Sequence, residues 1–266
     1  MVKELVAHLS DLHLSGRDRN VRAFIGGIGR RANAEVRAKK ASAAIARVRA
    51  SGAAHLIITG DLTETGRIDE YEVLAEVLQS SGMPAERITL VPGNHDVYDS
   101  ADAWTRALEG PLAPYASTSA HRGAQVVERG PFAIVPIDTT MHQTVLRSAG
   151  ILRIETVNEL VSTLREPAFA RHARVIAMHH PPLVSTSRMW HRQDGLQGAE
   201  ALPAALAEAP PTTLLHGHVH RDATQPLGRH VVASITATVE DPPDAPRFAL
   251  YRVAEDAMGA PRLCRI

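Results

Sequence analysis

The sequence predicts an α/β protein, and two observations lead to that fold class. Short apolar runs rich in β-branched residues recur along the chain and have the length of strands. Between them lie segments whose apolar residues recur at helical spacing, and strands alternating with helices are typical of layered α/β folds. With 266 residues, 44% of them hydrophobic, the chain can fill one large core. Because it shows no internal repeat and no long low-complexity linker, we expect a single domain over residues 1–266.

The expected elements follow from the spacing of the apolar residues. Strands are expected at 5–9, 56–59, 88–91, 132–137, 174–178, 212–215, 230–235 and 248–253. Helices are expected at 38–50, 68–79, 156–164 and 199–209. The last two strands have no helix between them, which predicts that part of the sheet is antiparallel.

Charge and composition argue against several classes of protein. Lys+Arg and Asp+Glu both number 29, whereas a nucleic-acid binder is usually basic, and aromatic residues make up only 4%. No specific nucleic-acid partner is therefore expected. The single cysteine, Cys264, cannot form an intramolecular disulfide, and no apolar run has the length of a signal peptide or a membrane span. These features predict a cytoplasmic protein.

The segment 17–40 is unusually basic. It holds eight lysines and arginines, among apolar residues and three glycines. One interpretation is a solvated loop that leads into a helix. The other is a flap that attracts an anionic substrate or makes a weak contact with a membrane surface.

Five of the expected strands are followed by polar clusters built from Asp, Asn and His. These are Ser10-Asp11-Leu12-His13, Gly60-Asp61, Pro92-Gly93-Asn94-His95-Asp96, His179-His180 and His216-Gly217-His218-Val219-His220. In α/β folds the loops at the carboxyl ends of neighbouring strands converge, so the five clusters predict one pocket. Each cluster alone is weak, since a Gly-Asp pair is often a turn. Their joint occurrence directly after apolar runs favours a metal site.

The type and number of these side chains favour two metal ions. Residues two apart in extended chain, as in Asp11-x-His13 and His218-x-His220, project to the same side. Imidazole and carboxylate without thiolate suit manganese, iron, zinc or cobalt. Seven candidate ligands are too many for one tetrahedral ion but fit two ions that share a carboxylate. Two ions roughly 3.5–4 Å apart can activate water and clamp a phosphate during an in-line displacement, which predicts a hydrolase of phosphate esters.

The combined pattern Asp11-x-His13, Gly60-Asp61, Gly93-Asn94-His95-Asp96, His179 and Gly217-His218-x-His220 resembles the calcineurin-like metallophosphoesterases. The resemblance covers about residues 2–220 and implies a four-layer α/β/β/α sandwich with two mixed sheets. It implies a dinuclear site of divalent ions (Mn²⁺, Fe²⁺/Fe³⁺ or Zn²⁺), with one ion held by Asp11, His13, Asp61 and His220. The second ion would be held by Asp61, Asn94, His179 and His218, so that Asp61 bridges the pair.

The resemblance also implies roles for residues beside the ligands. His95 would contact the phosphate and protonate or stabilise the leaving group. His179 rather than His180 is expected as the ligand, because the family places the ligand two residues before a proline, here Pro181. His180 and Asp96 are expected to support the ligands or to contact substrate, and His216 is interpreted as a strand-end residue.

Local sequence narrows the branch of the family. The tyrosine that purple acid phosphatases place three residues after the bridging aspartate is absent, and so is the Asp-Arg-Gly pattern of protein phosphatases. The stretches 60–66, 70–71 and 91–96 instead resemble the bacterial class III cyclic-nucleotide phosphodiesterases and the related glycerophosphodiesterases. That branch implies hydrolysis of cyclic nucleotides or other small phosphodiesters by a hydroxide that bridges the metal ions.

Three alternatives remain open at this point. The basic segment 17–40 keeps the hydrolysis of an anionic lipid-linked pyrophosphate of the UDP-diacylglucosamine type in view, and a general phosphomonoesterase is also compatible. A non-catalytic protein-binding scaffold is disfavoured, because all seven ligand positions carry competent side chains. The expected partner is a small phosphoester, and a homodimer stays open because related enzymes often pair.

Overall fold

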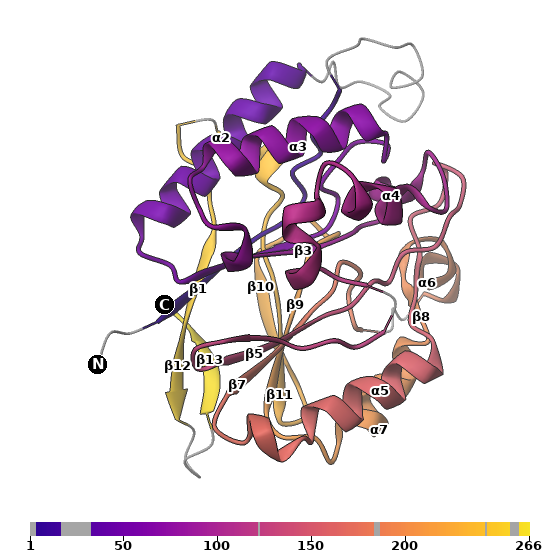
Figure 1. Cartoon of the computed structure of the whole chain (residues 1–266). Helices are drawn as coiled ribbons and strands as arrows, with labels where there is room; N and C mark the ends of the chain where they lie inside the picture. Colours follow the sequence, from indigo (N-terminus) through magenta and orange to yellow (C-terminus); the bar gives the residue numbers. More distant parts are fainter. Residues whose placement is uncertain (1–3, 17–32, 122, 184–186, 243, 256–260) are drawn as a thin grey trace.

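The computed structural model describes residues 4–16, 33–121, 123–183, 187–242, 244–255 and 261–266. Two β-sheets lie face to face between two layers of helices, with α2 and α3 outside one sheet and α5 and α7 outside the other (Figure 1). Both sheets contain parallel and antiparallel pairs. The predicted four-layer α/β/β/α sandwich with two mixed sheets is confirmed.

The first sheet has the strand order β13-β12-β1-β2-β3. Its parallel strands are β1 (Leu5–Leu9), β2 (His55–Thr59) and β3 (Ile88–Val91). β12 (Ala249–Glu255) runs antiparallel to β1 and to β13 (Pro261–Arg265), so the antiparallel component expected near the end of the chain is present.

The second sheet has the order β10-β11-β9-β7-β5-β4. Its parallel centre and antiparallel edges consist of β4 (Val127–Arg129), β5 (Phe132–Pro136), β7 (Ala173–Ala177), β9 (Thr212–His216), β10 (Ala223–Leu227) and β11 (His230–Ser234). β11 is parallel to β9, because β10 first turns the chain round in an antiparallel hairpin that the apolar spacing did not predict. A separate small sheet pairs β6 (Gly150–Ile151) with β8 (Leu196–Gln197).

The helices follow the expected stripes with some differences. They are α2 (Ala34–Ala50), α3 (Ile68–Ser80), α4 (Ala103–Glu109), α5 (Ile154–Leu164), α6 (Arg188–Asp194) and α7 (Leu202–Leu206). Short 3-10 turns are η1 (Ala85–Arg87), η2 (His95–Val97), η3 (Ala113–Thr118), η4 (Pro167–Phe169), η5 (Ala199–Ala201) and η6 (Thr238–Glu240). The helix expected at 199–209 is thus divided into η5 and α7, and α4 and α6 were not predicted.

The basic segment 17–40 is described only from residue 33 onward, and from Ala34 this part is helical rather than a loop. Residues 17–32, with five of its arginines, lie outside the described residues. Helix α2 begins at Ala34 because the Asn33 side chain accepts hydrogen bonds from two backbone N–H groups of its first turn. Residues 34–40 are therefore helical. No helix in the described ranges is long and apolar enough to cross a membrane.

Three apolar layers hold the sandwich together. One lies between α2–α4 and the first sheet, the second between the two sheets, and the third between the second sheet and α5 and α7. Burial of this apolar surface fixes each strand against its neighbours. The carboxyl ends of β1, β2, β3, β7 and β9 are consequently held at one edge, from which the polar clusters emerge.

Candidate metal centre

Backbone hydrogen bonds bring the polar clusters of different strands together. The loops after β1 and β2 run side by side, since Asp11 N donates to Gly60 O at 3.0 Å and His13 N donates to Asp61 O at 2.8 Å. The loop after β9, from the other sheet, joins them where His218 N donates to Asp11 Oδ2 at 3.3 Å. One site therefore forms across the two sheets, as the five clusters predicted.

The backbone of this site adopts a conformation that side chains disfavour. Within the described residues, five non-glycine positions have a positive φ, and all five are predicted ligands: Asp11 (55°), His13 (47°), Asp61 (45°), His218 (70°) and His220 (50°). The left-handed conformation brings Cβ too close to the carbonyl oxygen and costs about 1–2 kcal/mol per residue. Strained backbone of this kind is concentrated at functional sites, where it aims side chains that regular strands would point elsewhere.

Two glycines make room for the ligands. Gly60 has a φ of 84°, and a Cβ at this position would collide with the imidazole of His179. A Cβ at Gly93 would collide with the carboxyl group of Asp61. Any side chain at either position would displace a predicted ligand, which explains why glycine stands there.

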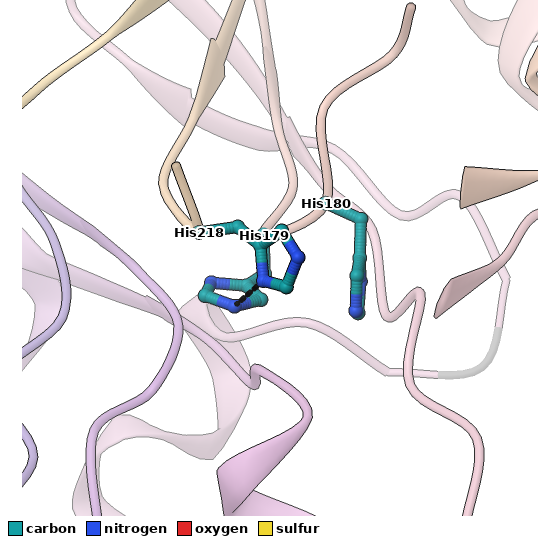
Figure 2. Close-up of side chains that lie close together, drawn as sticks. All are labelled: His179, His180 and His218. Carbon is teal, nitrogen blue, oxygen red and sulfur yellow. Dashed lines mark hydrogen bonds between the residues drawn. The ribbon is translucent and has the colours of Figure 1, made fainter. Parts of the chain in front are cut away.

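One group of predicted ligands surrounds His179. Its Nδ1 donates to Thr59 O at 2.8 Å, which leaves the lone pair on Nε2. His218 Nε2 donates to Asp194 O at 3.0 Å, which leaves the lone pair on Nδ1. These two lone-pair nitrogens face each other at 3.2 Å (Figure 2). Two acceptors at this distance repel each other unless a proton or a cation lies between them.

Two further acceptor atoms join this group. Asn94 Oδ1 lies 3.2 Å from His179 Nε2, and its orientation is fixed because Asn94 Nδ2 donates to the Tyr98 hydroxyl at 2.7 Å. Asp61 Oδ1 lies 3.4 Å from the same nitrogen. Burial opposes positive charge here, but Asp61 and Asp11 outweigh it and raise the pKa of His179 to about 9. The electrostatics that favour a proton on this nitrogen also favour a metal ion.

A second group lies on the other side of Asp61. His220 donates from Nδ1 to Glu240 Oε1 at 3.0 Å and places Nε2 3.3 Å from Asp11 Oδ1. His13 turns Nδ1 to Glu64 Oε2 at 3.4 Å and Nε2 to Asp61 Oδ2 at 3.7 Å. Asp11 Oδ1 and His13 Nε2 are buried and have no hydrogen-bond partner. Because an unsatisfied buried polar atom is costly, these two atoms fit a cation that they would share.

Asp61 connects the two groups. Its Oδ1 faces His179 and its Oδ2 faces His13. Burial opposes its ionisation, yet the electrostatic interaction with His179, and after it with His95, lowers the pKa of the Asp61 carboxyl well below its usual value. A carboxylate with one oxygen toward each group has the geometry of a bridging ligand.

The residues present therefore fit two metal ions. Ligands 2.0–2.2 Å from one ion are about 3–3.5 Å apart. The three separations around His179 lie in this range, as does the contact of His220 with Asp11, whereas His13 Nε2 lies 3.7 Å from Asp61 Oδ2. Each of the four histidines donates one ring N–H to a carbonyl or carboxylate oxygen and turns the other nitrogen inward, as metal-binding histidines do.

His95 lies beside the two groups rather than within them. It begins η2, and its Nδ1 donates to Glu64 O at 2.7 Å. Its Nε2 is 3.9 Å from Asp61 Oδ2, and 25% of its side chain is exposed. Burial lowers the pKa of His95, although Asp61 opposes this shift. The free nitrogen thus faces the centre from the open side, where a substrate would enter.

Known proteins that resemble the chain identify its family. Residues 5–222 match the family described as calcineurin-like phosphoesterases. The chain belongs to this family. The predicted resemblance, including its phosphodiesterase branch, is confirmed by the relatives described next.

Two curated phosphodiesterases are similar to the chain. A 3′,5′-cyclic-nucleotide phosphodiesterase of Nostoc sp. is 28% identical over 168 residues, which cover 63% of this chain and 56% of that protein. The glycerophosphodiester phosphodiesterase GpdQ of Enterobacter lignolyticus is 27% identical over 241 residues, or 90% of this chain and 79% of that protein. The chain thus matches just over half of the cyanobacterial relative.

Solved structures share the fold at lower identity. A dimetal phosphatase from Danio rerio superposes with a TM-score of 0.70 at 15% identity, and the match covers 95% of this chain and 93% of that one. This likeness concerns the fold of the calcineurin-like phosphoesterases.

The two histidines next to predicted ligands, His180 and His216, have different surroundings in this calcineurin-like phosphoesterase. His180 uses both ring nitrogens, with Nδ1 2.8 Å from Thr139 Oγ1 and Nε2 3.1 Å from Ser148 O. It therefore has no lone pair to offer an ion, which favours His179 as the ligand. His216 ends β9, and its Nδ1 donates to Gly217 O at 2.9 Å.

Asp96 is fully buried and ties two ligand loops together. Its carboxylate accepts hydrogen bonds from the backbone N–H groups of Leu62 at 3.0 Å, Thr63 at 2.8 Å and Gly93 at 2.8 Å. Burial and the neighbouring Asp61 charge raise its pKa to about 6. Asp96 thus orients the loops that carry Asp61 and Asn94 and cannot reach a substrate.

Several residues of the site were not predicted from the sequence. Glu64, Glu240 and the carbonyl of Asp194 orient three of the histidines, and Tyr98 orients Asn94. Arg37, a buried residue of α2, donates to His13 O at 2.6 Å and to Glu64 Oε2 at 2.5 Å. Of these residues, only Glu64 lies in a stretch, 60–66, on which the resemblance to the phosphodiesterase branch rested.

Proposed function

We propose that the protein is a phosphodiesterase that holds two divalent metal ions with Asp11, His13, Asp61, Asn94, His179, His218 and His220. The observation that carries this proposal is the pair of lone-pair clusters on either side of Asp61. Two such ions, when bound, supply hydroxide near neutral pH and withdraw charge from the phosphoryl oxygens. Mn²⁺, Fe²⁺/Fe³⁺ and Zn²⁺ all suit this donor set.

In this proposal His95 transfers a proton to the leaving group. Its Nδ1–H is held by Glu64 O, so Nε2 is the atom that gains and loses the proton. Burial keeps the free imidazole largely neutral, and the negative charge of a bound phosphate favours its protonated form. Nε2–H then donates to the departing oxygen as the ester bond breaks.

The substrate class rests on the relatives and on the local sequence around Asp61. Both curated relatives act on phosphodiesters, one on 3′,5′-cyclic nucleotides and the other on glycerophosphodiesters. A small phosphodiester is therefore the favoured substrate. The lipid-linked pyrophosphate alternative relied on the segment 17–40, of which residues 17–32 lie outside the described ranges. The scaffold alternative is disfavoured by the complete donor set.

The experiment is a panel of substrates offered to the manganese-loaded protein. It compares an aryl phosphate monoester, an aryl phosphodiester, cyclic AMP and a nucleotide-sugar lipid by kcat/KM. We expect the diesters to be turned over fastest. A fully loaded sample that leaves all four substrates intact would refute the proposed function, and a clear preference for the monoester or the lipid would refute its substrate class.

Two variants separate metal binding from proton transfer. Asp61→Ala removes the proposed bridge and should lose both bound metal and turnover. His95→Ala should keep both ions and lose turnover by about 10²–10⁴-fold, the usual effect of a positioned acid or base. His121→Ala, at an exposed histidine of the same chain, serves as the matched control. Metal content measured by elemental analysis decides the outcome: two tightly bound ions in Asp61→Ala would contradict the assignment.

The wider context is also part of the proposal. We expect a small-molecule phosphoester as partner and a cytoplasmic location. The homodimer remains a prediction, which a mass measurement in solution tests. The membrane contact through 17–40 also remains a prediction, which co-sedimentation with vesicles tests.

A further inference from the structure

A basic pocket lies beside helix α6, outside the two ligand groups. Its volume is about 670 Å³, and its lining includes Arg147, Arg188, His191, Arg192 and Glu200. Helix α6 and the short strand β8, which carry most of these residues, lie side by side (Figure 1). The lining therefore carries three arginines against one glutamate.

The three guanidinium groups have no carboxylate partner among the described residues. The one hydrogen bond recorded for them runs from Arg147 Nε to the backbone carbonyl of Arg192, at 3.1 Å. Elsewhere in the chain, Arg37 and Arg265 each pair with a carboxylate. Three like charges around one cavity repel each other, and an anion bound among them removes that cost. Guanidinium groups also match the geometry of phosphate oxygens.

Paired backbone gives this pocket a fixed frame. Ser148 N donates to Gln193 O and Gly150 N donates to Gly195 O, both at 3.1 Å. The pairing of β6 with β8 continues this contact. The arginines thus project from two segments that hold each other in register, which is what a preorganised binding site requires.

The same two segments contact the metal centre. Asp194, the last residue of α6, accepts the hydrogen bond of His218 Nε2 and lies two residues after Arg192. On the other segment, the Tyr98 hydroxyl contacts the carbonyl of Arg147 at 3.3 Å and accepts from Asn94 Nδ2. Hydrogen bonds of Asp194 and Tyr98 therefore connect the two segments of the pocket to the predicted ligands His218 and Asn94.

We propose that this pocket binds a second phosphate-type group of the substrate whose diester bond is cleaved at the metal centre. The inference rests on the proposed function and deepens it, because it assigns the substrate to phosphodiesters that carry a further phosphoryl group. Arg188 and Arg192 lie one helical turn apart on α6, and together with Arg147 they bind this group.

A phosphate-type group is also present in an anionic lipid headgroup. The surface beside the pocket has features that could contact lipid. Leu146 (82% exposed), Met189 (83%) and Trp190 (47%) flank the arginines. Exposed apolar side chains next to arginines are also found where proteins contact lipid surfaces. The experiments below therefore distinguish a soluble substrate from a vesicle.

The first experiment compares two substrates that differ by one phosphate. Thymidine 5′-(4-nitrophenyl phosphate) carries only the scissile diester, and its 3′-phosphorylated form carries the second group. We expect kcat/KM to be at least about tenfold higher for the 3′-phosphorylated form, and this ratio to fall toward one in Arg188→Gln/Arg192→Gln. Arg229→Gln, an exposed arginine of the β10–β11 turn, should keep the ratio.

The second experiment measures binding without turnover. Of the two tryptophans in the chain, Trp104 is buried and Trp190 lies in α6 between the two arginines. Inorganic phosphate titrated into the metal-loaded protein should change the Trp190 fluorescence with saturation. The change should disappear in Arg188→Gln/Arg192→Gln and persist in Arg229→Gln.

The outcomes separate this inference from the proposed function. If neither substrate is turned over, the proposed function fails and the fluorescence titration still tests the pocket. Equal kcat/KM for both substrates in the unsubstituted protein, or a ratio that survives in the double variant, would overturn the inference. A third outcome would also overturn it: equal kcat/KM for the two substrates, together with arginine-dependent binding to phosphatidylglycerol vesicles but not to phosphatidylcholine vesicles. This result would assign the anion to a lipid headgroup.

Discussion

The left-handed backbone at the metal centre predicts that glycine is more stable than alanine at a ligand position. His220 is suitable for this test because its φ is 50° and 30% of its side chain is exposed. Both His220→Gly and His220→Ala remove the imidazole with its contacts to Asp11 and Glu240. The two variants therefore differ chiefly in the Cβ of alanine, which disfavours a positive φ.

The expected difference follows from two opposing terms. The left-handed conformation costs alanine about 1–2 kcal/mol, whereas glycine tolerates it. Against this, glycine has the more flexible unfolded chain, which costs it about 0.5–1 kcal/mol. His220→Gly should thus exceed His220→Ala in the free energy of unfolding by about 0.75 kcal/mol, the midpoint of a range from about 0 to 1.5 kcal/mol. Urea denaturation in the presence of a chelator measures it, because bound metal would add its own stabilisation.

A pair of variants in a regular helix provides the control. Lys39 lies in α2 and is well exposed, so the sign should reverse there, with Lys39→Gly less stable than Lys39→Ala by about 1 kcal/mol. If His220→Gly proved no more stable than His220→Ala while the Lys39 pair behaved normally, the ligand backbone would not be strained and the argument from positive φ would fall.

Three further predictions concern burial and positioning. Burial lowers the pKa of His55 to about 3, so this residue contributes stability above the unfolded pKa of 6.5, and that stability is lost as the pH falls toward 3. Between pH 7 and pH 5 the loss in the free energy of unfolding is about 2 kcal/mol. Urea denaturation of His55→Gln should therefore show a smaller dependence on pH than that of the unsubstituted protein. Asp96→Ala leaves three backbone N–H groups without their acceptor and should cost about 3 kcal/mol or more; a loss below 1 kcal/mol would contradict the role of Asp96 as a tie between loops. Arg37→Gln should weaken Mn²⁺ binding about tenfold in calorimetry, since Glu64 loses the partner that holds it against His13, and unchanged affinity would remove Arg37 from the site.

The central strands were predictable because each is buried on both faces. The strand β5, with the sequence Phe-Ala-Ile-Val-Pro, is a continuous apolar run, and such a run leaves few alternatives. The strand β10 was missed because most of its side chains are exposed at the edge of a sheet, and it contains Pro226. Edge strands depend on the hydrogen bonds of a neighbour, here β11, and not on their own apolar pattern.

The two helices that were missed are short and lack a long apolar stripe. In α6 all seven residues are at least partly exposed, so burial leaves no periodic signal in its sequence. Its position is set by backbone contacts with the segment around Arg147 and Ser148, which is more than forty residues away in the chain. The basic pocket could therefore not be anticipated from the sequence, because its arginines come together only in the folded chain.

The same distinction separates the ligands from the residues that orient them. The proposed ligands lie in loops that follow strand ends, and only these loops converge at the site, so the positions of the ligands in the sequence are constrained. The extended chain expected for Asp11-x-His13 and His218-x-His220 is wrong, because all four residues have a positive φ in the structure. An orienting group needs only an acceptor oxygen within reach of one ring nitrogen. The backbone carbonyls of Thr59 and Asp194 serve His179 and His218 in this way, and a carbonyl is present at every residue. Such partners leave no mark on side-chain identity, and the tautomers that turn one lone pair of each of the four histidines toward the candidate metal centre follow from the fold rather than from the motif.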